Sequence, residues 1–372
     1  MKKNRRSSKN IIVIGAGFAG SVAARLLAEA GHNVDIFDKR EHIAGNAYDY
    51  FDDFGVLVHK YGPHIFHTPN KTIFDFLSNF TDWKEYKHIA KTVVDKNFLP
   101  FPINLETLNT FFNQNFLPEE CESFIENKRI NNSQIENSED LVLASFGKEI
   151  YEKFFKGYSE KQWGIPMKEL KVSVASRRIK FKNSYDEYYF NDRYQAMPKN
   201  GYTAMFEKML DHKNINIFLN QEKSKSDLEN YDHAVFTGSL DFFYDYKFGS
   251  LPYRSLVFEF EHFDSVDYMF PAGQINYPDL QNKFTRITEF KHITGQKCQG
   301  TTIAKEYPTS EGDPYYPIPK KEYEDIFKLY KKDSKKEKDY TFIGRLAEYK
   351  YYDMHQVVGS SMQKTKLLLK NL

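Results

Sequence analysis

Three glycines near the N-terminus have the spacing of a site that binds a dinucleotide. Gly15, Gly17 and Gly20 form the pattern G-x-G-x-x-G. In this pattern the first glycine permits a tight turn, the second lets the backbone approach a pyrophosphate, and the third lets a helix pack close to a strand. The N-terminus of that helix would offer its N–H groups to the phosphates. Asp38 follows in the sequence where a carboxylate can accept hydrogen bonds from ribose hydroxyls.

The segments around the glycines have the order of a βαβ unit. Residues 10–14 form a short β-branched run that suits a buried parallel strand, and residues 34–38 form a second one. Between them, residues 21–30 have the apolar spacing of a helix that packs on a sheet, and Gly31 stands where a C-terminal cap is expected. We therefore predict a Rossmann-like domain at the N-terminus.

The loop after Asp38 favours FAD over NAD as the cofactor. The glycine motif alone does not separate the two, but Lys39, Arg40, Gly45 and Asn46 follow the second strand directly. A basic, glycine-containing loop at this point is common in flavoproteins of this fold, whereas an NAD dehydrogenase would be expected to continue into another helix and strand.

Two histidines, His64 and His67, form the pattern H-x-x-H within GPHIFHT. Such a pair can bind a metal ion, but the preceding Gly-Pro argues against a helix and the sequence offers no evident third ligand. We therefore predict no metal. A histidine beside a cofactor could instead tune its protonation, because imidazole titrates near neutral pH.

Composition and charge narrow the class of protein. A chain of 372 residues is expected to form two or three domains, and a formal net charge of +1 gives no field that would gather nucleic acid. No apolar run approaches the roughly 18 residues of a membrane span, and the run after the basic residues 1–10 is too short for a signal peptide. We read those residues as a disordered tail. Cys121 and Cys298 form no disulfide framework. A cytoplasmic location is expected.

The remaining chain predicts a mixed α/β fold with three parts. Residues 92–112 read as a strand hairpin leading into a helix capped by Asn104, and residues 116–162 read as helical. Alternating β-rich runs at 172–195 and 253–308 predict an antiparallel sheet, and residues 331–339 a solvated loop. The predicted parts are an FAD-binding domain of residues 1–90, 200–250 and 325–372, a helical domain of 104–171, and an antiparallel sheet domain of 91–103, 172–199 and 251–324.

Long segments of the chain resemble bacterial UDP-galactopyranose mutases. The matching segments, which span nearly the whole chain, are IGAGFAG, KREHIAGNAYD, HKYGPHIFHT, GYSEKQWG, YFNDRYQAMPKNGYT, YDYKFG, LPYRSL, TRITEFKH, AKEYP, GDPYYPI and GRLAEYKYYDMHQ. The resemblance implies an enzyme that interconverts the six- and five-membered ring forms of UDP-galactose and supplies galactofuranose for cell-surface glycans. It further implies that FAD must be reduced, that flavin N5 attacks the anomeric carbon as UDP leaves, and that the reaction has no net redox change. A homodimer is also implied.

The resemblance assigns the diphosphate to arginines. Arg286 matches the family arginine that holds it, although from the sequence alone an ion pair with Glu289 would be the simpler interpretation. For a second arginine, on a loop that is mobile in the family, Lys182 is the best match. Arg177 and Arg178 remain alternatives. Lysine can neutralise phosphate but cannot form the planar fork of arginine.

Other residues match family positions around the substrate and the flavin. Tyr158 and Trp163 match residues around the uracil. The remaining matches to substrate-binding positions are Tyr194, Glu306, Tyr316 and Tyr351. The matches to the cofactor site are Gly15, Gly17, Phe18, Gly20, Asp38, Lys39, Asn46, His64, His67, Arg345, Asp353 and Met354. Arg345 near the flavin would favour its anionic reduced form. Ala44 stands where the family has glycine, and it carries strain if its φ is positive.

Three alternatives to this function remain open on the sequence. The first is an FAD-dependent oxidoreductase of the same fold, which would oxidise its substrate. The second is a protein that binds flavin or nucleotide sugar without turnover. The third is a mutase that also accepts UDP-N-acetylgalactosamine, although His67 retains the residue usual in galactose-specific enzymes.

Overall fold

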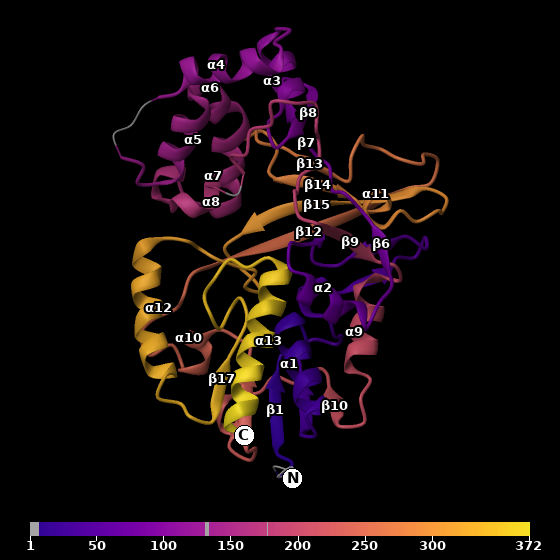
Figure 1. Ribbon diagram of the computed structural model, residues 1–372, viewed down its shortest axis with the longest axis vertical. Helices are drawn as coiled ribbons and strands as arrows, with labels where there is room; N and C mark the ends of the chain where they lie inside the picture. The colour runs from indigo at the N-terminus through magenta and orange to yellow at the C-terminus, as the bar shows by residue number, and fades with distance from the viewer. Residues whose placement is uncertain (1–6, 131–133, 177) are drawn as a thin grey trace.

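A five-stranded parallel sheet forms the lower part of the molecule in the computed structural model, which describes residues 7–130, 134–176 and 178–372 (Figure 1). Its strand order is β10 (Ile215–Phe218), β2 (Asn33–Phe37), β1 (Asn10–Ile14), β11 (His233–Phe236) and β17 (Tyr340–Phe342). Every neighbouring pair is parallel. The Rossmann-like prediction is thus confirmed. Residues 1–6, within the predicted N-terminal tail, lie outside the described residues.

Helices cover both faces of the parallel sheet. On one face lie α1 (Phe18–Glu29), α9 (Gly201–Leu210) and the long C-terminal α13 (Met354–Asn371), packed on a core that includes Ile11 and Val13. On the other face, α10 (Leu240–Phe243) and α12 (Lys321–Ser334) pack over Ile12 and Phe236. Because side chains of β1 alternate between the faces, one strand anchors both layers.

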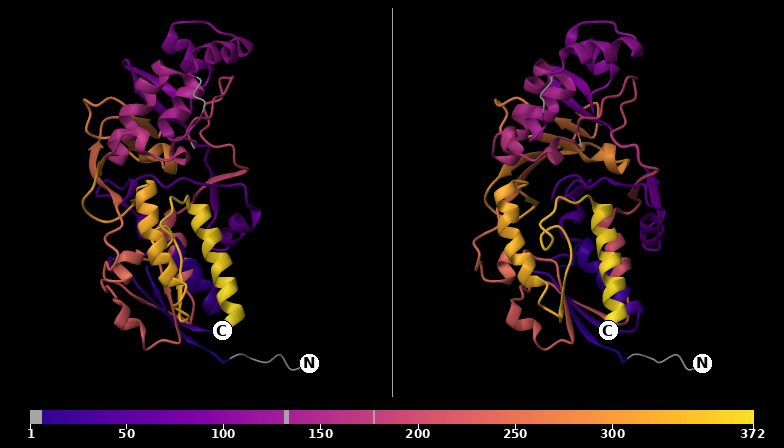
Figure 2. Two further views of the ribbon diagram at one scale, coloured as in Figure 1. Left: turned by 90° about the vertical axis from the view of Figure 1, so that its left-hand side faces the viewer. Right: turned by 60° about the vertical axis from the view of Figure 1, so that its left-hand side comes forward.

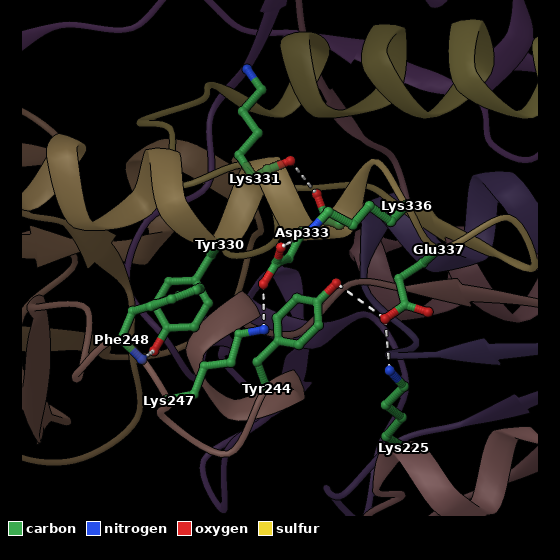
Figure 3. Close-up of polar contacts among 10 residues, drawn as sticks. Lys225, Tyr244, Lys247, Phe248, Tyr330, Lys331, Asp333, Lys336 and Glu337 are labelled. Atoms are coloured by element: carbon green, nitrogen blue, oxygen red, sulfur yellow. Dashed lines mark hydrogen bonds and ion pairs between the residues drawn. The ribbon is translucent and has the colours of Figure 1, made fainter.

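The helix α12 corrects the loop predicted at residues 331–339. Tyr323, Ile326, Phe327 and Tyr330 have the i, i+3, i+4, i+7 spacing of a helix face and pack against the sheet, so the helix continues to Ser334. Residues 335–339 lie outside the regular elements, as predicted, and two acids of the run are paired. Asp333, in the last turn of α12, accepts from Lys247 and Lys336, and Glu337 accepts from Lys225 and Tyr244 (Figure 3). The charge run was misread because its lysines and acids alternate without apolar residues.

A seven-stranded sheet lies between the parallel sheet and the helical upper part (Figures 1 and 2). Its order is β16 (Tyr316–Pro317), β12 (Tyr253–Phe263), β15 (Thr301–Thr309), β14 (Arg286–Glu289), β13 (Gln274–Asn276), β7 (Ala90–Val94) and β8 (Asn97–Phe101). The predicted antiparallel sheet is confirmed except at β13 and β7, which pair in parallel. No tight turn joins these two strands, since they lie far apart in the sequence, and their direction is therefore not fixed by a hairpin.

The strands predicted within residues 172–195 are wrong for most of that range. Val172–Ser176 form the short helix α8, and the described residues from 178 to 193 contain only an isolated bridge at Lys182 and another at Tyr188. The strand β9 (Tyr194–Pro198) joins a separate three-stranded sheet, between β5 (Phe66–Thr68) and β6 (Trp83–Glu85). Two of its aromatic residues, Tyr189 and Phe190, line a cavity instead of a strand face.

The upper part of the molecule is helical (Figure 2). It contains α3 (Leu105–Phe112), α4 (Pro118–Lys128), α5 (Ser138–Phe146), α6 (Lys148–Ile150), a π-helical turn (Tyr151–Lys156) and α7 (Gly157–Trp163). The side chain of Asn104 accepts from the Thr107 N–H at 2.9 Å, which confirms the predicted cap after the β7–β8 hairpin. We propose that this layer and the two large sheets correspond to the three predicted domains.

The shorter elements connect these layers. They are the 3-10 turns Gly45–Ala47, Met167–Glu169 and Lys225–Leu228, the strands β3 (Asp49–Phe51) and β4 (Leu57–His59), and the helices α2 (Lys71–Ser78) and α11 (Phe290–Thr294). Among the described residues, none of the helices combines the length and apolar character that crossing a membrane requires.

Candidate active site

A cavity of about 840 Å³ lies where the three layers meet. Its walls come from α7, from the seven-stranded sheet and from the N-terminus of α13. Many of the residues singled out in the sequence line it: His64, His67, Tyr158, Trp163, Arg286, Tyr316, Arg345, Tyr351, Asp353 and Met354. The fold thus gathers residues from positions 64 to 354 around one space.

Arg286 is held in the cavity wall by a buried carboxylate. It is the first residue of β14 and lies opposite Glu306 of β15, whose Oε2 accepts from the Arg286 Nε at 2.7 Å. Glu306 is 2% exposed. Burial lowers the pKa of Arg286, but Glu306 together with Tyr158 and Tyr316 outweighs this effect and raises the pKa above its usual range. The ion pair with Glu289 does not form, because Glu289 accepts from the backbone of Met269 and Phe270 instead.

A second guanidinium lies in the same wall, and it belongs to Arg178. The Arg178 guanidinium lies 4.5 Å from the centre of the Tyr158 ring and lines the cavity. Lys182, the residue that the sequence favoured, lies outside the residues that line the cavity; its amine donates to Asp186 and to the Tyr188 carbonyl. Arg177 lies outside the described residues. The structure therefore places an arginine, not a lysine, beside Arg286.

Aromatic side chains form the wall next to the two arginines. Trp163 is 6% exposed and meets Tyr316 and Tyr351 edge-on, with ring centres 6.3 and 5.9 Å apart. Arg345 lies over the Tyr316 ring at 5.1 Å and donates to the Tyr352 carbonyl at 2.6 Å. Tyr194 is not in this wall, since it stacks on Phe74 at 4.5 Å.

Two histidines of the cavity, His64 and His88, are buried and neutral. Burial, with smaller contributions from His59 and from two nearby arginines, lowers the pKa of His64 to about 3. Its Nδ1 lies 2.9 Å from the Gly62 carbonyl and so carries the proton, which leaves Nε2 as an acceptor. His64 therefore does not titrate near neutral pH, contrary to the expectation for a histidine beside a cofactor. Burial likewise lowers the pKa of His88, a cavity residue that the sequence did not reveal, to about 3.

His67 lies in a cluster of three potential metal ligands. Its Nδ1 contacts the Asp192 carboxylate, and its ring stacks on Phe190 at 3.6 Å. Ligand atoms of His67, Asp353 and His355 lie within 4.8 Å of one another, but His64 is not in this group, so the group is not the predicted H-x-x-H pair with a third ligand added. Zinc with bonds of about 2.1 Å brings tetrahedral ligands to roughly 3.4 Å from each other. The prediction of no metal stays a prediction.

The glycine motif has the close backbone packing that its spacing predicted. Gly15 has φ +98°, and a Cβ there would lie 2.1 Å from Thr237 Oγ1. A Cβ on Gly20 would lie 1.8 Å from the Gly15 carbonyl oxygen, so only glycine lets α1 pack on β1. A Cβ on Gly45 would lie 2.9 Å from the Gly17 Cα, and Phe18 begins α1. The loops that carry Gly17 and Gly45 therefore lie close together at the N-terminus of α1, with no side chains between their backbones.

Asp38 organises the loops beside these glycines. Its carboxylate accepts from the backbone N–H groups of Ala16 at 2.8 Å and Arg40 at 2.9 Å. Asn46 accepts from the Arg40 guanidinium, and Lys39 donates to Asp313 at 2.8 Å. Lys39 and Arg40 are thus paired with Asp313, and Asp38 retains lone pairs that can accept from a ribose.

The arrangement fits an extended dinucleotide. The N-terminus of α1 and the bare glycine backbone suit a pyrophosphate. The helix α13 is fastened to α1 by the Ser361 hydroxyl, which donates to the Ala19 carbonyl at 2.7 Å, and its N-terminal residues Asp353 and Met354 line the cavity. A cofactor whose phosphates lie at α1 can therefore have its ring system in the cavity.

Comparisons with known proteins agree with this geometry. The family model for UDP-galactopyranose mutase matches residues 153–351, and a model for an NAD(P)-binding Rossmann-like domain matches residues 13–80. The chain is 40% identical to a probable UDP-galactopyranose mutase of Klebsiella pneumoniae, over 96% of this chain and 94% of the other. It is 36% identical to the dTDP-fucopyranose mutase of Escherichia coli, over 97% and 98%. A crystal structure of reduced UDP-galactopyranose mutase superimposes with a TM-score of 0.77 at 13% identity, covering 99% of this chain and 95% of that one.

Proposed function

Because the chain belongs to the UDP-galactopyranose mutase family, a family of FAD-dependent isomerases, we propose that it interconverts UDP-galactopyranose and UDP-galactofuranose. The observation that carries this proposal is the pair of guanidinium groups, Arg286 and Arg178, that face one cavity lined by Tyr158 and Trp163. A nucleoside diphosphate has the charge and the flat base that such a wall binds. An oxidase that acts on an uncharged substrate would have no use for two arginines there.

The two arginines act on the departing diphosphate. The negative charge on UDP increases as its bond to the anomeric carbon breaks, and fixed guanidinium groups stabilise that charge without rearranging. Glu306 accepts a hydrogen bond from Arg286 and so fixes its position, and the guanidinium of Arg178 packs on the ring of Tyr158. Reduced FAD, when bound, supplies a nucleophilic nitrogen that lets the anomeric carbon exchange UDP with no net oxidation. Residues Gly15, Gly17, Asp38, Asp353 and Met354 would hold this cofactor.

Two further groups set the environment of the reacting sugar. His64 is neutral, so its free Nε2 can accept a hydrogen bond from a cofactor or sugar group without adding positive charge. The Arg345 guanidinium, oriented by the carbonyls of Tyr315 and Tyr352, supplies the positive charge that favours an anionic reduced flavin. We propose these roles for both residues, together with a supply of galactofuranose to cell-surface glycans. The cytoplasmic location and the homodimer stay predictions.

A second nucleotide sugar is a specific alternative. The 36% identity to a dTDP-fucopyranose mutase covers 97% of the chain, which is nearly the coverage of the first relative. The two substrates differ in the methyl group of thymine, in the 2′-hydroxyl of the ribose and in the sugar. Turnover of UDP-galactofuranose and of dTDP-fucofuranose by the reduced enzyme should therefore be compared at equal concentrations. A larger kcat/KM for the UDP sugar supports the proposal, and a larger value for the dTDP sugar overturns it.

A further inference from the structure

The amine of Lys161 lies inside a cup of four backbone carbonyls. Lys161 belongs to α7, between Tyr158 and Trp163, and its Nζ donates to the carbonyls of Tyr277, Asp279, Asn282 and Phe284 at 2.7, 2.6, 2.9 and 2.9 Å. These four residues belong to one loop, 277–285, which joins β13 to β14. An ammonium can donate only three hydrogen bonds at once, so the cup saturates it.

That loop leads directly into the diphosphate arginine. Asn276 pairs with Arg286 across the β13–β14 hairpin, and the Tyr277 N–H donates to the Thr285 carbonyl at 2.8 Å. The loop is further shaped by Asp279, which accepts from the backbone N–H groups of Gln281 and Asn282. Lys161 therefore joins the helix that carries the aromatic wall to the hairpin that carries Arg286.

Two other contacts hold α7 against the same sheet. The buried Arg254 of β12 donates from Nε to the Gln162 carbonyl at 3.0 Å and from Nη2 to the Lys161 carbonyl at 3.2 Å, at the C-terminal end of α7. A Cβ on Gly157 would lie 2.3 Å from the Pro278 carbonyl oxygen, so the helix and the loop are in close backbone contact. The preceding π-helical turn shifts the register of the helix at this point.

We propose that Lys161 is a positioning residue that keeps the base-binding helix and the diphosphate arginine at a fixed separation; this inference rests on the proposed function. A ligand that contacts both subsites at once gains from that separation, as a two-site ligand gains from a linker that matches the distance between its sites. A ligand that contacts one subsite gains little. Lys161 therefore contributes to the affinity for UDP more than to the affinity for uridine.

The test compares the binding of UDP and of uridine to three flavin-loaded proteins: the wild-type enzyme, Lys161→Met and the control Lys156→Met. Lys156 is an exposed lysine five residues before Lys161. Lys161→Met keeps the length of the side chain and removes its charge. We expect its UDP dissociation constant to rise roughly tenfold or more and that of uridine less than threefold, with Lys156→Met unchanged for both ligands.

Equal losses for the two ligands, or no loss for UDP, would overturn the positioning role. If the wild-type enzyme binds no UDP, the proposed function fails instead. If Lys161→Met does not fold, Gly157→Ala serves in its place. Its methyl group pushes α7 away from the loop, while Lys161 and Arg286 are both retained. The same selective loss for UDP is expected from it, and its absence would overturn the inference.

Discussion

The Nε and Nη2 atoms of Arg286 both lie 2.7 Å from a single oxygen of Glu306. One carboxylate oxygen thus fixes the guanidinium plane and leaves its other edge to the cavity. Since Glu306 is 2% exposed, it is screened little by solvent. The pair makes Arg286 a rigid, charged group that suits the diphosphate of the proposed substrate.

Replacing Arg286 by lysine should therefore lower the activity strongly, even though the positive charge is kept. The variant Arg286→Lys keeps the charge but loses the planar fork, so we expect kcat/KM to fall roughly 100-fold or more. The matched control is Arg25→Lys, at an i,i+4 pair with Glu29 on α1. Steady-state kinetics with UDP-galactofuranose measure both. A fall of less than threefold for Arg286→Lys would show that the guanidinium of Arg286 does not bind the diphosphate as proposed.

The second guanidinium should prove to be Arg178 rather than Lys182. We expect Arg178→Met to lower the affinity for UDP about tenfold or more, because an opposing charge is lost from the cavity. Lys182→Met, which removes an amine bound to Asp186 and Tyr188, should change UDP affinity less than twofold. Calorimetric titration with UDP decides between them, and the reverse order of effects would return the role to Lys182.

This pair of residues shows where the sequence was insufficient. Motif matching placed the second cation within a few positions but favoured Lys182, because the choice depends on how residues 178–193 pass around the cavity. That path is set by contacts distant in sequence, such as Phe190 on His67 and Lys91 with Glu187. His88 was missed for the same reason. No local pattern marks a lone histidine that the connection between β6 and β7 brings into a cavity.

Local patterns succeeded where local physics decides the structure. The glycine spacing, the β-branched runs and the Asn104 cap each have a nearest-neighbour cause, and the structure has the predicted turn, strands and helix there. Pairing direction and helix length were less predictable. The parallel contact of β13 with β7 joins distant segments, and the end of α12 follows from how Tyr330 packs on a sheet that the charge run does not reveal.

Acid should destabilise the fold through buried histidines. Burial lowers the pKa of His59 to about 4 and of His88 to about 3. The unfolded chain binds these protons below about pH 6.5 and the folded chain does not, so stability is complete above pH 6.5 and falls as the pH decreases toward 4. As the pH falls below 6.5, we expect the free energy of unfolding to decrease by roughly 1.4 kcal/mol per pH unit for each such histidine. Thermal unfolding at pH 7.5 and 5 measures it.

The variant His88→Asn isolates one of these protons. Its unfolding free energy should depend less steeply on pH below 6.5 than that of the wild-type protein, whatever its stability at pH 7.5. An unchanged slope would show that His88 is protonated in the folded protein.

Ala44 should be a site where glycine stabilises the protein. Ala44 has φ 71°, which is unfavourable for an L-residue by about 1–2 kcal/mol, and glycine adopts it freely. We expect Ala44→Gly to raise the free energy of unfolding by about 1 kcal/mol. Ala47→Gly is the matched control, since Ala47 is also buried but lacks a positive φ, and it should destabilise. Urea unfolding would contradict this account if both substitutions destabilise equally.

We infer that this chain is a mutase whose flavin takes part in the reaction only when reduced. The most direct measurement incubates the purified, FAD-loaded protein with UDP-galactofuranose, once with the flavin oxidised and once after reduction by dithionite, and separates the products by chromatography. We expect UDP-galactopyranose in the reduced sample and none in the oxidised sample. Absence of conversion in both samples, with flavin bound and the protein folded, would contradict it.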